Sequence, residues 1–254
     1  SRGSKGSRPS LVGVPQGLAI SNFLAEIALL SIDAPFKARS DIWFNRYVDD
    51  ILILTPAGAS KAVADEVIAA LTALGLTPHP PGASGSKSKI APLTEPFTFL
   101  GYEIAGGSIN IRRESVLRFE SSLASIFTGY RHRLLRATSP SEKLAAIDLC
   151  RWRLNLRITG CVFEGRRLGW VFYFSQITAT DRLRAVNRTI EVLLERFSLT
   201  GHIRPKSMIK AYYESKRKNK LSHAYIPNFD TMSVVEQRKI LSLLLGTARI
   251  AKLS

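Results

Sequence analysis

The sequence predicts an α+β fold, with an antiparallel sheet and helices in its first part and mainly helices after it. Two kinds of pattern lead to this fold class. Residues 42–54 and 97–111 hold short strand-forming runs on either side of turn residues, which is typical of β-hairpins. Residues 60–74 and 181–197 place apolar side chains at helical spacing, which is typical of amphipathic helices.

The first two elements follow from residues 11–54. Residues 11–30 predict a turn followed by a helix that Ser21 caps, because apolar residues recur at helical spacing after that serine. Residues 42–54 then predict two short strands that flank a tight turn at Val48–Asp49.

Residues 60–74 predict a helix that Gly75 closes. The proline-rich residues 77–96 predict a loop or an irregular edge. Residues 97–111 predict a hairpin with Gly106–Gly107 as its turn.

From Glu114 onward the pattern is largely helical. Ser139-Pro140-Ser141-Glu142 predicts a helix start, because serine caps, proline fits the first turn and glutamate follows three residues after the cap. Residues 181–197 carry one apolar stripe, and residues 204–220 and 233–253 predict two further helices.

The charge distribution divides the chain near residue 110. Residues 1–110 hold nine basic and nine acidic residues, whereas residues 111–254 hold 27 basic and 11 acidic residues and so carry the net charge of +16. A surface this basic favours a polyanion such as nucleic acid, although a generally basic surface is the simpler alternative. We predict three domains, at residues 1–110, 111–200 and 201–254.

Two further features concern the compartment. Cys150 and Cys161 have no metal-ligand spacing, which favours reduced thiols and a cytoplasmic protein, with a disulfide between them as the alternative. Charged residues interrupt every apolar run before the ~18 residues that a membrane helix needs, so we expect no membrane contact.

Asp49 and Asp50 are adjacent carboxylates between two strand-forming runs. Like charges side by side repel each other unless a cation offsets them. Mg²⁺ suits such a pair, because it prefers carboxylate oxygens and keeps substrate phosphates among its other ligands. Two such ions can catalyse phosphoryl transfer, with Mn²⁺ as a substitute. An ordinary Asp-Asp turn is the alternative.

Four segments in order resemble sequence blocks of the reverse transcriptase family. Gly13–Ile27 resembles the block called motif B, and Phe44–Leu52, with Tyr47-Val48-Asp49-Asp50, resembles motif C. Lys87–Ile90 resembles motif D, and Phe97–Tyr102 resembles motif E, the primer grip. The resemblance covers roughly residues 11–105, and four ordered motifs are more specific than any one of them. It implies a partial right-hand polymerase palm, followed by a helical thumb and a C-terminal extension.

The resemblance also implies roles for individual residues. Asp49 and Asp50 would hold the metal ions, and Lys87 would protonate pyrophosphate, with Lys89 as the alternative. The nucleotide and template would be bound by Gln16, Gly17, Ser21, Tyr47 and Val48. The primer would be held by Phe99, Leu100, Gly101 and Tyr102, although core packing is an alternative for the first two.

One family feature is not found in these residues. The family places another catalytic aspartate upstream of the glutamine-glycine loop, and Asp33 follows that loop and so stands in the wrong order. We therefore expect an upstream fingers and palm segment, in the same protein or in a separate chain, to complete the site. This chain alone should bind metal weakly and not polymerise, and adding the upstream fragment should restore primer extension.

Basic residues interleave with aromatic ones after residue 110, a mixture that suits phosphate contact and base stacking. The segment 170–174 is instead typical of a buried core. The predicted nucleic-acid contacts are Arg151, Arg153, Arg157, Arg166, Arg167, Lys210, Lys216, Arg217 and Lys218.

The resemblance implies an RNA-directed DNA polymerase that uses an RNA template, a DNA or RNA primer and dNTPs. The motif forms most resemble bacterial reverse transcriptases of antiviral defence and abortive infection, with retron and group II intron types as alternatives. A non-coding RNA or a second copy of the chain are further possible partners. An RNA-dependent RNA polymerase and a non-catalytic RNA-binding scaffold are the rival functions.

Overall fold

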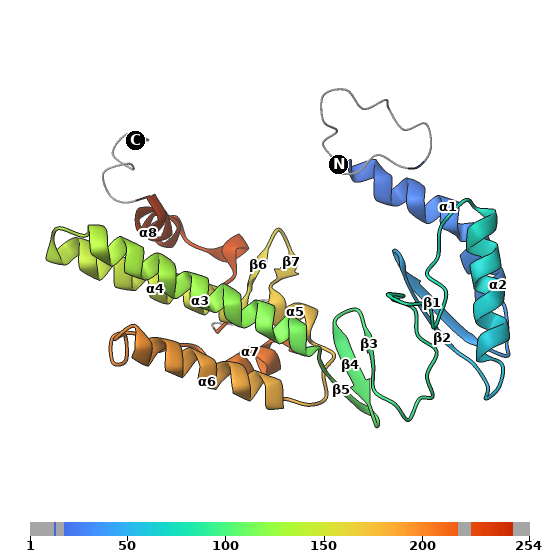
Figure 1. Cartoon of the computed structure of the whole chain (residues 1–254). Helices are drawn as coiled ribbons and strands as arrows, with labels where there is room; N and C mark the ends of the chain where they lie inside the picture. The colour runs from blue at the N-terminus through green and yellow to red at the C-terminus, as the bar shows by residue number, and fades with distance from the viewer. Residues whose placement is uncertain (1–12, 14–17, 218–224, 246–254) are drawn as a thin grey trace. The chain divides into compact units, whose positions relative to one another are not determined.

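The computed structural model describes residue 13 and residues 18–217 and 225–245 (Figure 1). It divides into two compact units, Ser1–Glu95 and Pro96–Ser254. Each unit has its own buried cluster of apolar residues, so each is considered separately.

The first unit contains α1 (Ala19–Lys37), β1 (Trp43–Tyr47), β2 (Asp50–Leu54) and α2 (Ser60–Ala73). Strands β1 and β2 form an antiparallel hairpin that is closed by the pair Tyr47↔Asp50, as the sequence predicts. Helix α1 packs on β1 and on α2. The predicted loop at residues 77–96 contains no helix or strand.

The core of the first unit lies between α1, α2 and the hairpin. It is formed by the buried side chains of Ile32, Phe36, Phe44 and Val67. The rings of Phe36 and Phe44 stack with their centroids 5.5 Å apart and so join α1 to β1.

Helix α1 differs from its predicted boundaries. Its N-cap is Leu18, with extended backbone angles, so the prediction that Ser21 caps the helix was wrong. The helix also continues through Pro35 to Lys37. Burial of Ile32 and Phe36 against the core extends it, although proline removes one backbone hydrogen bond.

The second unit begins with a three-stranded antiparallel sheet of β3 (Phe97–Phe99), β4 (Tyr102–Ala105) and β5 (Ser108–Ile111). The predicted turn at Gly106–Gly107 joins β4 to β5, and both glycines have positive φ. The sequence patterns did not predict the second turn, at Leu100–Gly101, because leucine rarely adopts the φ of 48° found there. The compact units divide before β3, whereas the charge composition changes near residue 110, within β5.

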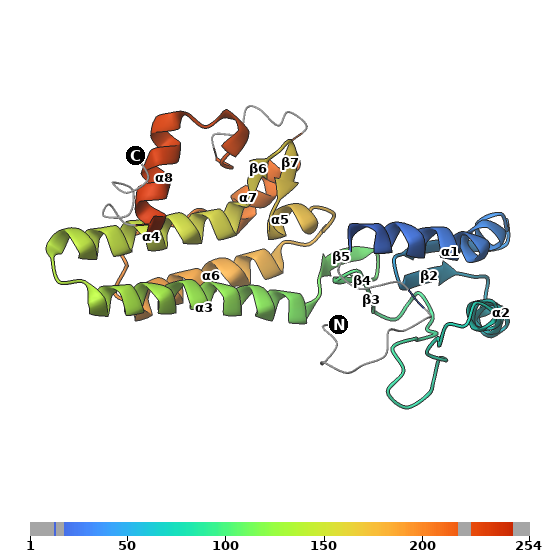
Figure 2. The same cartoon turned by 90° about the horizontal axis from the view of Figure 1, so that it is seen from above.

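Four helices enclose the main core of the second unit: α3 (Arg113–Arg136), α4 (Pro140–Thr159), α6 (Asp181–Arg196) and α7 (Met208–Ser215). Helices α3 and α4 form a long antiparallel pair, and α6 runs along α3 (Figure 2). The predicted start of α4 is confirmed, because Ser139 and Glu142 form a reciprocal capping box.

The smaller elements of this unit were harder to predict. Strands β6 (Cys161–Phe163) and β7 (Arg166–Leu168) form a hairpin that the sequence patterns did not predict. The segment 170–174 forms α5 (Trp170–Tyr173) and its C-cap, with Val171 and Phe174 in the core as predicted. Further along the chain come the 3-10 helix η1 (Phe229–Thr231) and α8 (Val234–Leu245).

None of the helices in the described ranges is both long and apolar enough to cross a membrane. Cys150 and Cys161 are both free thiols. Burial raises the pKa of the Cys150 thiol to about 11, so this side chain remains protonated at neutral pH.

Candidate active site

The two adjacent aspartates lie at the end of the β1–β2 hairpin. Val48 and Asp49 form its two-residue loop, and Asp50 begins β2 opposite Tyr47. Val48 has a φ of 55°, which a β-branched residue rarely adopts. The loop is tight because the strand ladder continues to the last pair of residues before it.

The carboxylates of Asp49 and Asp50 are exposed to solvent. Within the ranges that the structure describes, neither has a hydrogen bond or an ion pair. Two carboxylates on one turn fit a divalent cation such as Mg²⁺, which takes oxygen ligands and uses only one or two protein carboxylates. The described residues contain no group of three or more His, Cys, Asp or Glu side chains that could hold a metal ion.

Arg46 supports this turn from the inner side of the hairpin. Only 2% of its side chain is exposed, and it forms five hydrogen bonds. Two go to Asp33 at 2.8 and 3.0 Å, and two go to Glu26 at 2.7 and 3.1 Å. The fifth reaches the carbonyl oxygen of Val48 at 2.7 Å.

The Arg46 network shifts the titration of both carboxylates. The hydrogen bond from Arg46 holds the pKa of Glu26 below its ordinary value. Burial acts to raise the pKa of Asp33, but the hydrogen bonds from Arg46 and Lys37 outweigh it, so that pKa is also lowered. The same bonds raise the pKa of Arg46, which therefore stays charged.

Sequence order excluded Asp33 as the family's upstream catalytic aspartate, and no role was predicted for Arg46. The structure gives Asp33 a role as the buried partner of Arg46. A signal was present in the sequence, because Arg46 follows buried Phe44 by two residues and so lies on the same, inner face of β1. That signal can be interpreted only when it is known that α1 covers this face of the hairpin.

The other predicted nucleotide-binding residues divide into three groups. Tyr47 and Val48 are 57% and 47% exposed beside the two aspartates. Ser21 is buried in the first turn of α1, with 6% of its surface exposed. Gln16 and Gly17 lie outside the described residues.

The two candidate lysines in the loop after α2 differ in their contacts. Lys89 forms an exposed ion pair with Glu95 at 3.1 Å. Lys87 is exposed and forms no hydrogen bond or ion pair with the residues that the structure describes. This difference agrees with the choice of Lys87 as the proton donor, which stays a prediction.

The predicted primer grip belongs to the second unit, where α5 holds the Leu100–Gly101 turn. The hydroxyl of Tyr173 donates to the carbonyl oxygen of Leu100 at 2.9 Å, and the hydroxyl of Tyr102 donates to the carbonyl oxygen of Tyr173. A Cβ atom at Gly101 would lie 3.4 Å from the ring of Phe174. Burial raises the pKa of Tyr102, which stays protonated at neutral pH. Phe99 is half-buried on β3.

Several of the predicted nucleic-acid contacts are already engaged within the second unit. Arg167 donates to the carbonyl oxygens of Ser215 and Arg217 and so closes the end of α7. Arg157 lies over the Phe119 ring and donates to Ser122, and its burial lowers its pKa. The remaining engaged residues are Arg151 with Asp148, Lys210 with Tyr225, Lys216 with Tyr212 and Arg217 with Glu214.

Arg153 and Arg166 differ from these residues. Both are exposed, and neither guanidinium group forms a hydrogen bond or an ion pair in the described part of the chain. Lys218 lies outside that part. Arg153 and Arg166 are therefore the members of the predicted set whose guanidinium groups are available for phosphate.

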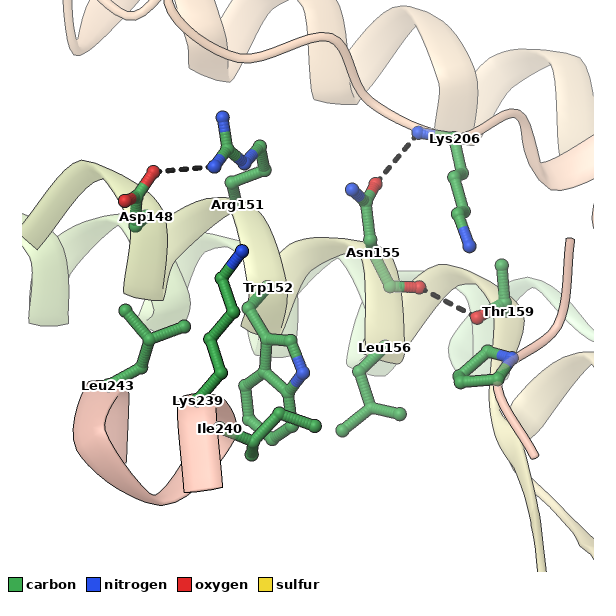
Figure 3. A pocket seen from close by; sticks show the side chains of 11 residues that line it. Asp148, Arg151, Trp152, Asn155, Leu156, Thr159, Lys206, Lys239, Ile240 and Leu243 are labelled. Atoms are coloured by element: carbon green, nitrogen blue, oxygen red, sulfur yellow. Dashed lines mark hydrogen bonds and ion pairs between the residues drawn. The ribbon is translucent and has the colours of Figure 1, made fainter. Parts of the chain in front are cut away.

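A pocket of about 270 Å³ lies between α4 and α8 (Figure 3). Trp152 and Ile240 line it together, and Lys239 and Arg151 lie nearby in the same view. Arg151 is paired with Asp148 at 2.5 Å, and the backbone N–H of Lys206 donates to Asn155 at 2.8 Å. The pocket is thus lined by apolar side chains together with basic groups and the carboxylate of Asp148.

The first part of the chain matches a known protein family. Residues 1–104 match the family model described as reverse transcriptase (RNA-dependent DNA polymerase). No curated protein matches the chain. The matched residues include the whole first unit, with its Asp49–Asp50 hairpin, and continue through β3 into β4. Residues 1–104 of this chain are therefore a domain of the reverse transcriptase family.

Proposed function

We propose that this chain contributes the metal-binding hairpin and the primer-binding region of an RNA-directed DNA polymerase. The observation that carries the proposal is a pair of exposed carboxylates, Asp49 and Asp50, that have no partner among the described residues and lie at the loop of a reverse transcriptase domain. Carboxylates that served only to stabilise a turn would be expected to accept hydrogen bonds from it.

In this proposal Asp49 and Asp50 hold two divalent cations. Cations held there would supply activation of the attacking 3′-hydroxyl group and stabilisation of the leaving pyrophosphate. Tyr47 and Val48, exposed on the same loop, contact the primer end and the incoming dNTP. Lys87, whose ammonium group is exposed, is the proton donor to pyrophosphate.

The second unit would bind the template and primer. Its sequence carries most of the basic excess, and nucleic acid is the polyanion that best matches a reverse transcriptase domain. Tyr102 and the Leu100–Gly101 turn would contact the primer, and their hydrogen bonds to α5 keep the turn fixed to the helices. Arg153 and Arg166 would contact phosphates.

The finer parts of the proposal rest on the motifs. They are an RNA template, a DNA or RNA primer, and an upstream palm segment that supplies a third carboxylate. A role in bacterial antiviral defence rests on the forms of motifs B and C alone.

Primer extension with Asp49→Asn and Asp50→Asn variants tests the proposal. The reaction contains an RNA template, a DNA primer, dNTPs and Mg²⁺, with the upstream palm segment added. Each substitution should reduce extension by at least about 100-fold, because metal stabilisation of the transition state contributes several kcal/mol. Binding of the template–primer should remain within about twofold, because both side chains lie on the hairpin of the first unit.

The control is Asp41→Asn, which changes an exposed carboxylate of the same unit that is paired with Arg39. It should leave extension unchanged. Full extension by the Asp49→Asn variant would refute the proposal. Template–primer binding without extension in every variant, wild type included, would favour the RNA-binding scaffold. Preference for NTPs over dNTPs would favour an RNA-dependent RNA polymerase.

A further inference from the structure

The loop that presents Asp49 has a backbone conformation that requires support. Val48 combines a β-branched side chain with a φ of 55°. Such a conformation persists where the surrounding structure determines it, and it occurs often at functional sites. The side chain of Val48 is 47% exposed, so packing does not supply that support.

A hydrogen bond to the loop backbone does supply it. The Nη1 atom of Arg46 donates to the carbonyl oxygen of Val48 at 2.7 Å. That carbonyl group belongs to the peptide unit whose nitrogen is the backbone nitrogen of Asp49. A movement of the Arg46 guanidinium group would therefore change the orientation of the Val48–Asp49 peptide plane directly.

The guanidinium group is itself fixed by α1. Its other four hydrogen bonds go to Glu26 and Asp33, which lie seven residues apart and so on the same face of that helix. All five N–H donors of Arg46 are thus used, and both carboxylates are bound in the two-pronged geometry that arginine favours. Lys37 adds a bond to Asp33 at 3.2 Å.

We propose that Arg46 is a positioning residue for the metal-binding loop, because it ties the Val48 carbonyl group to two carboxylates of α1. The inference rests on the proposed function in so far as it concerns metal. Glu26 and Asp33 hold the Arg46 guanidinium group in place, so the orientation of Asp49 depends on them as well.

A buried ion pair can also serve the fold alone, so the two roles need different predictions. If Arg46 only stabilises the unit, its replacement lowers the melting temperature and leaves the properties of the loop unchanged. If it positions the loop, lysine at this place retains the charge but cannot reach three acceptors from a rigid plane. The loop should then become mobile while the unit remains folded.

The test compares Arg46→Lys with Arg39→Lys in the full chain. Arg39 is a matched control, because it also binds two carboxylates, Asp41 and Glu66, and neither of them belongs to the hairpin loop. The first measurement is amide hydrogen exchange at residues 48–51 by NMR, which needs no metal. Exchange there should increase at least about tenfold in Arg46→Lys and not in Arg39→Lys.

The second measurement is Mn²⁺ titration by EPR, with Asp49→Asn defining the signal that belongs to the loop. Arg46→Lys should weaken the Asp49-dependent binding by about tenfold, as is usual when a residue that orients a metal ligand is changed. Glu26→Gln, at a side chain that is 51% exposed, should give a smaller change in the same direction. This variant also covers the case in which Arg46→Lys fails to fold.

The outcomes separate the two proposals. Unchanged exchange at residues 48–51 in both Arg46→Lys and Glu26→Gln would overturn the positioning role, whatever the enzyme does. Increased exchange, combined with no effect of Asp49→Asn on Mn²⁺ binding or primer extension, would keep the positioning role and overturn the proposed function.

Discussion

Gly160 and Gly169 show how single residues determine the geometry of the second unit. Their backbones meet at the open end of the β6–β7 hairpin, where α4 ends and α5 begins. A Cβ atom at Gly160 would lie 2.2 Å from the carbonyl oxygen of Leu168, and one at Gly169 would lie 2.6 Å from Cα of Gly160. Both also have positive φ, at 64° and 137°. Glycine is required there by space as well as by conformation.

Gly160→Ala should therefore destabilise the second unit by roughly 3 kcal/mol or more, because backbone strain and a backbone clash add. Gly165→Ala is the matched control in the same hairpin. Its φ is 67°, but no described atom lies within 4 Å of the place that a Cβ atom would take, so its cost should be about 1 kcal/mol. Urea unfolding followed by far-UV circular dichroism measures both. Equal destabilisation would contradict the close approach of the two backbones.

Between elements, the Arg46 network joins α1 to the β1–β2 hairpin and should make the first unit sensitive to acid. The pKa values of Glu26 and Asp33 are lowered in the folded chain, from ordinary values of 4.5 and 3.8. Their contribution to stability is therefore complete above pH 4.5 and is lost as the pH falls through the lowered values.

Asp33→Asn should reduce the loss of stability of the first unit between pH 5 and pH 3, while lowering its stability at pH 7. Asp41→Asn is the control, since its carboxylate also has a lowered pKa through Arg39 but is 55% exposed, against 8% for Asp33. It should have the smaller effect, because water screens exposed pairs. Trp43 is the single tryptophan of residues 1–95, so its fluorescence in a Trp152→Phe/Trp170→Phe background reports this unit. An equal effect of both variants would contradict a buried network.

Across the molecule, charge is concentrated in the second unit, but much of it is engaged in internal contacts. Arg167 caps α7, and Arg157 lies against Phe119, so sequence counts overstate the charge that is free to bind phosphate. Arg153 and Arg166 are exposed without such partners among the described residues.

Arg153→Gln and Arg166→Gln should each weaken binding to an RNA–DNA duplex and reduce the slope of log K against log salt by roughly 0.7–0.9, the value for one phosphate contact. Arg167→Gln should instead lower the melting temperature and leave the slope unchanged. Fluorescence anisotropy at several salt concentrations measures the slopes. A reduced slope for Arg167→Gln alone would show that the contacts lie elsewhere.

The sequence by itself determined the elements whose signals are local. The β1–β2 hairpin around Val48–Asp49, the capping box at Ser139 and the apolar stripe of α6 all follow from neighbouring residues, and the structure confirms them. The motif order also indicated the family that the comparison found for residues 1–104.

The tertiary structure alone decided the rest, because it depends on residues far apart in sequence. The turn at Leu100–Gly101 forms against Tyr173 and Phe174, and the β6–β7 hairpin forms where Gly160 meets Gly169. A role for Arg46 could be inferred only from the structure, in which Glu26 and Asp33 of α1 form ion pairs with it. The sequence determined which residues present the carboxylates, and packing between helix and hairpin determined what holds them in place.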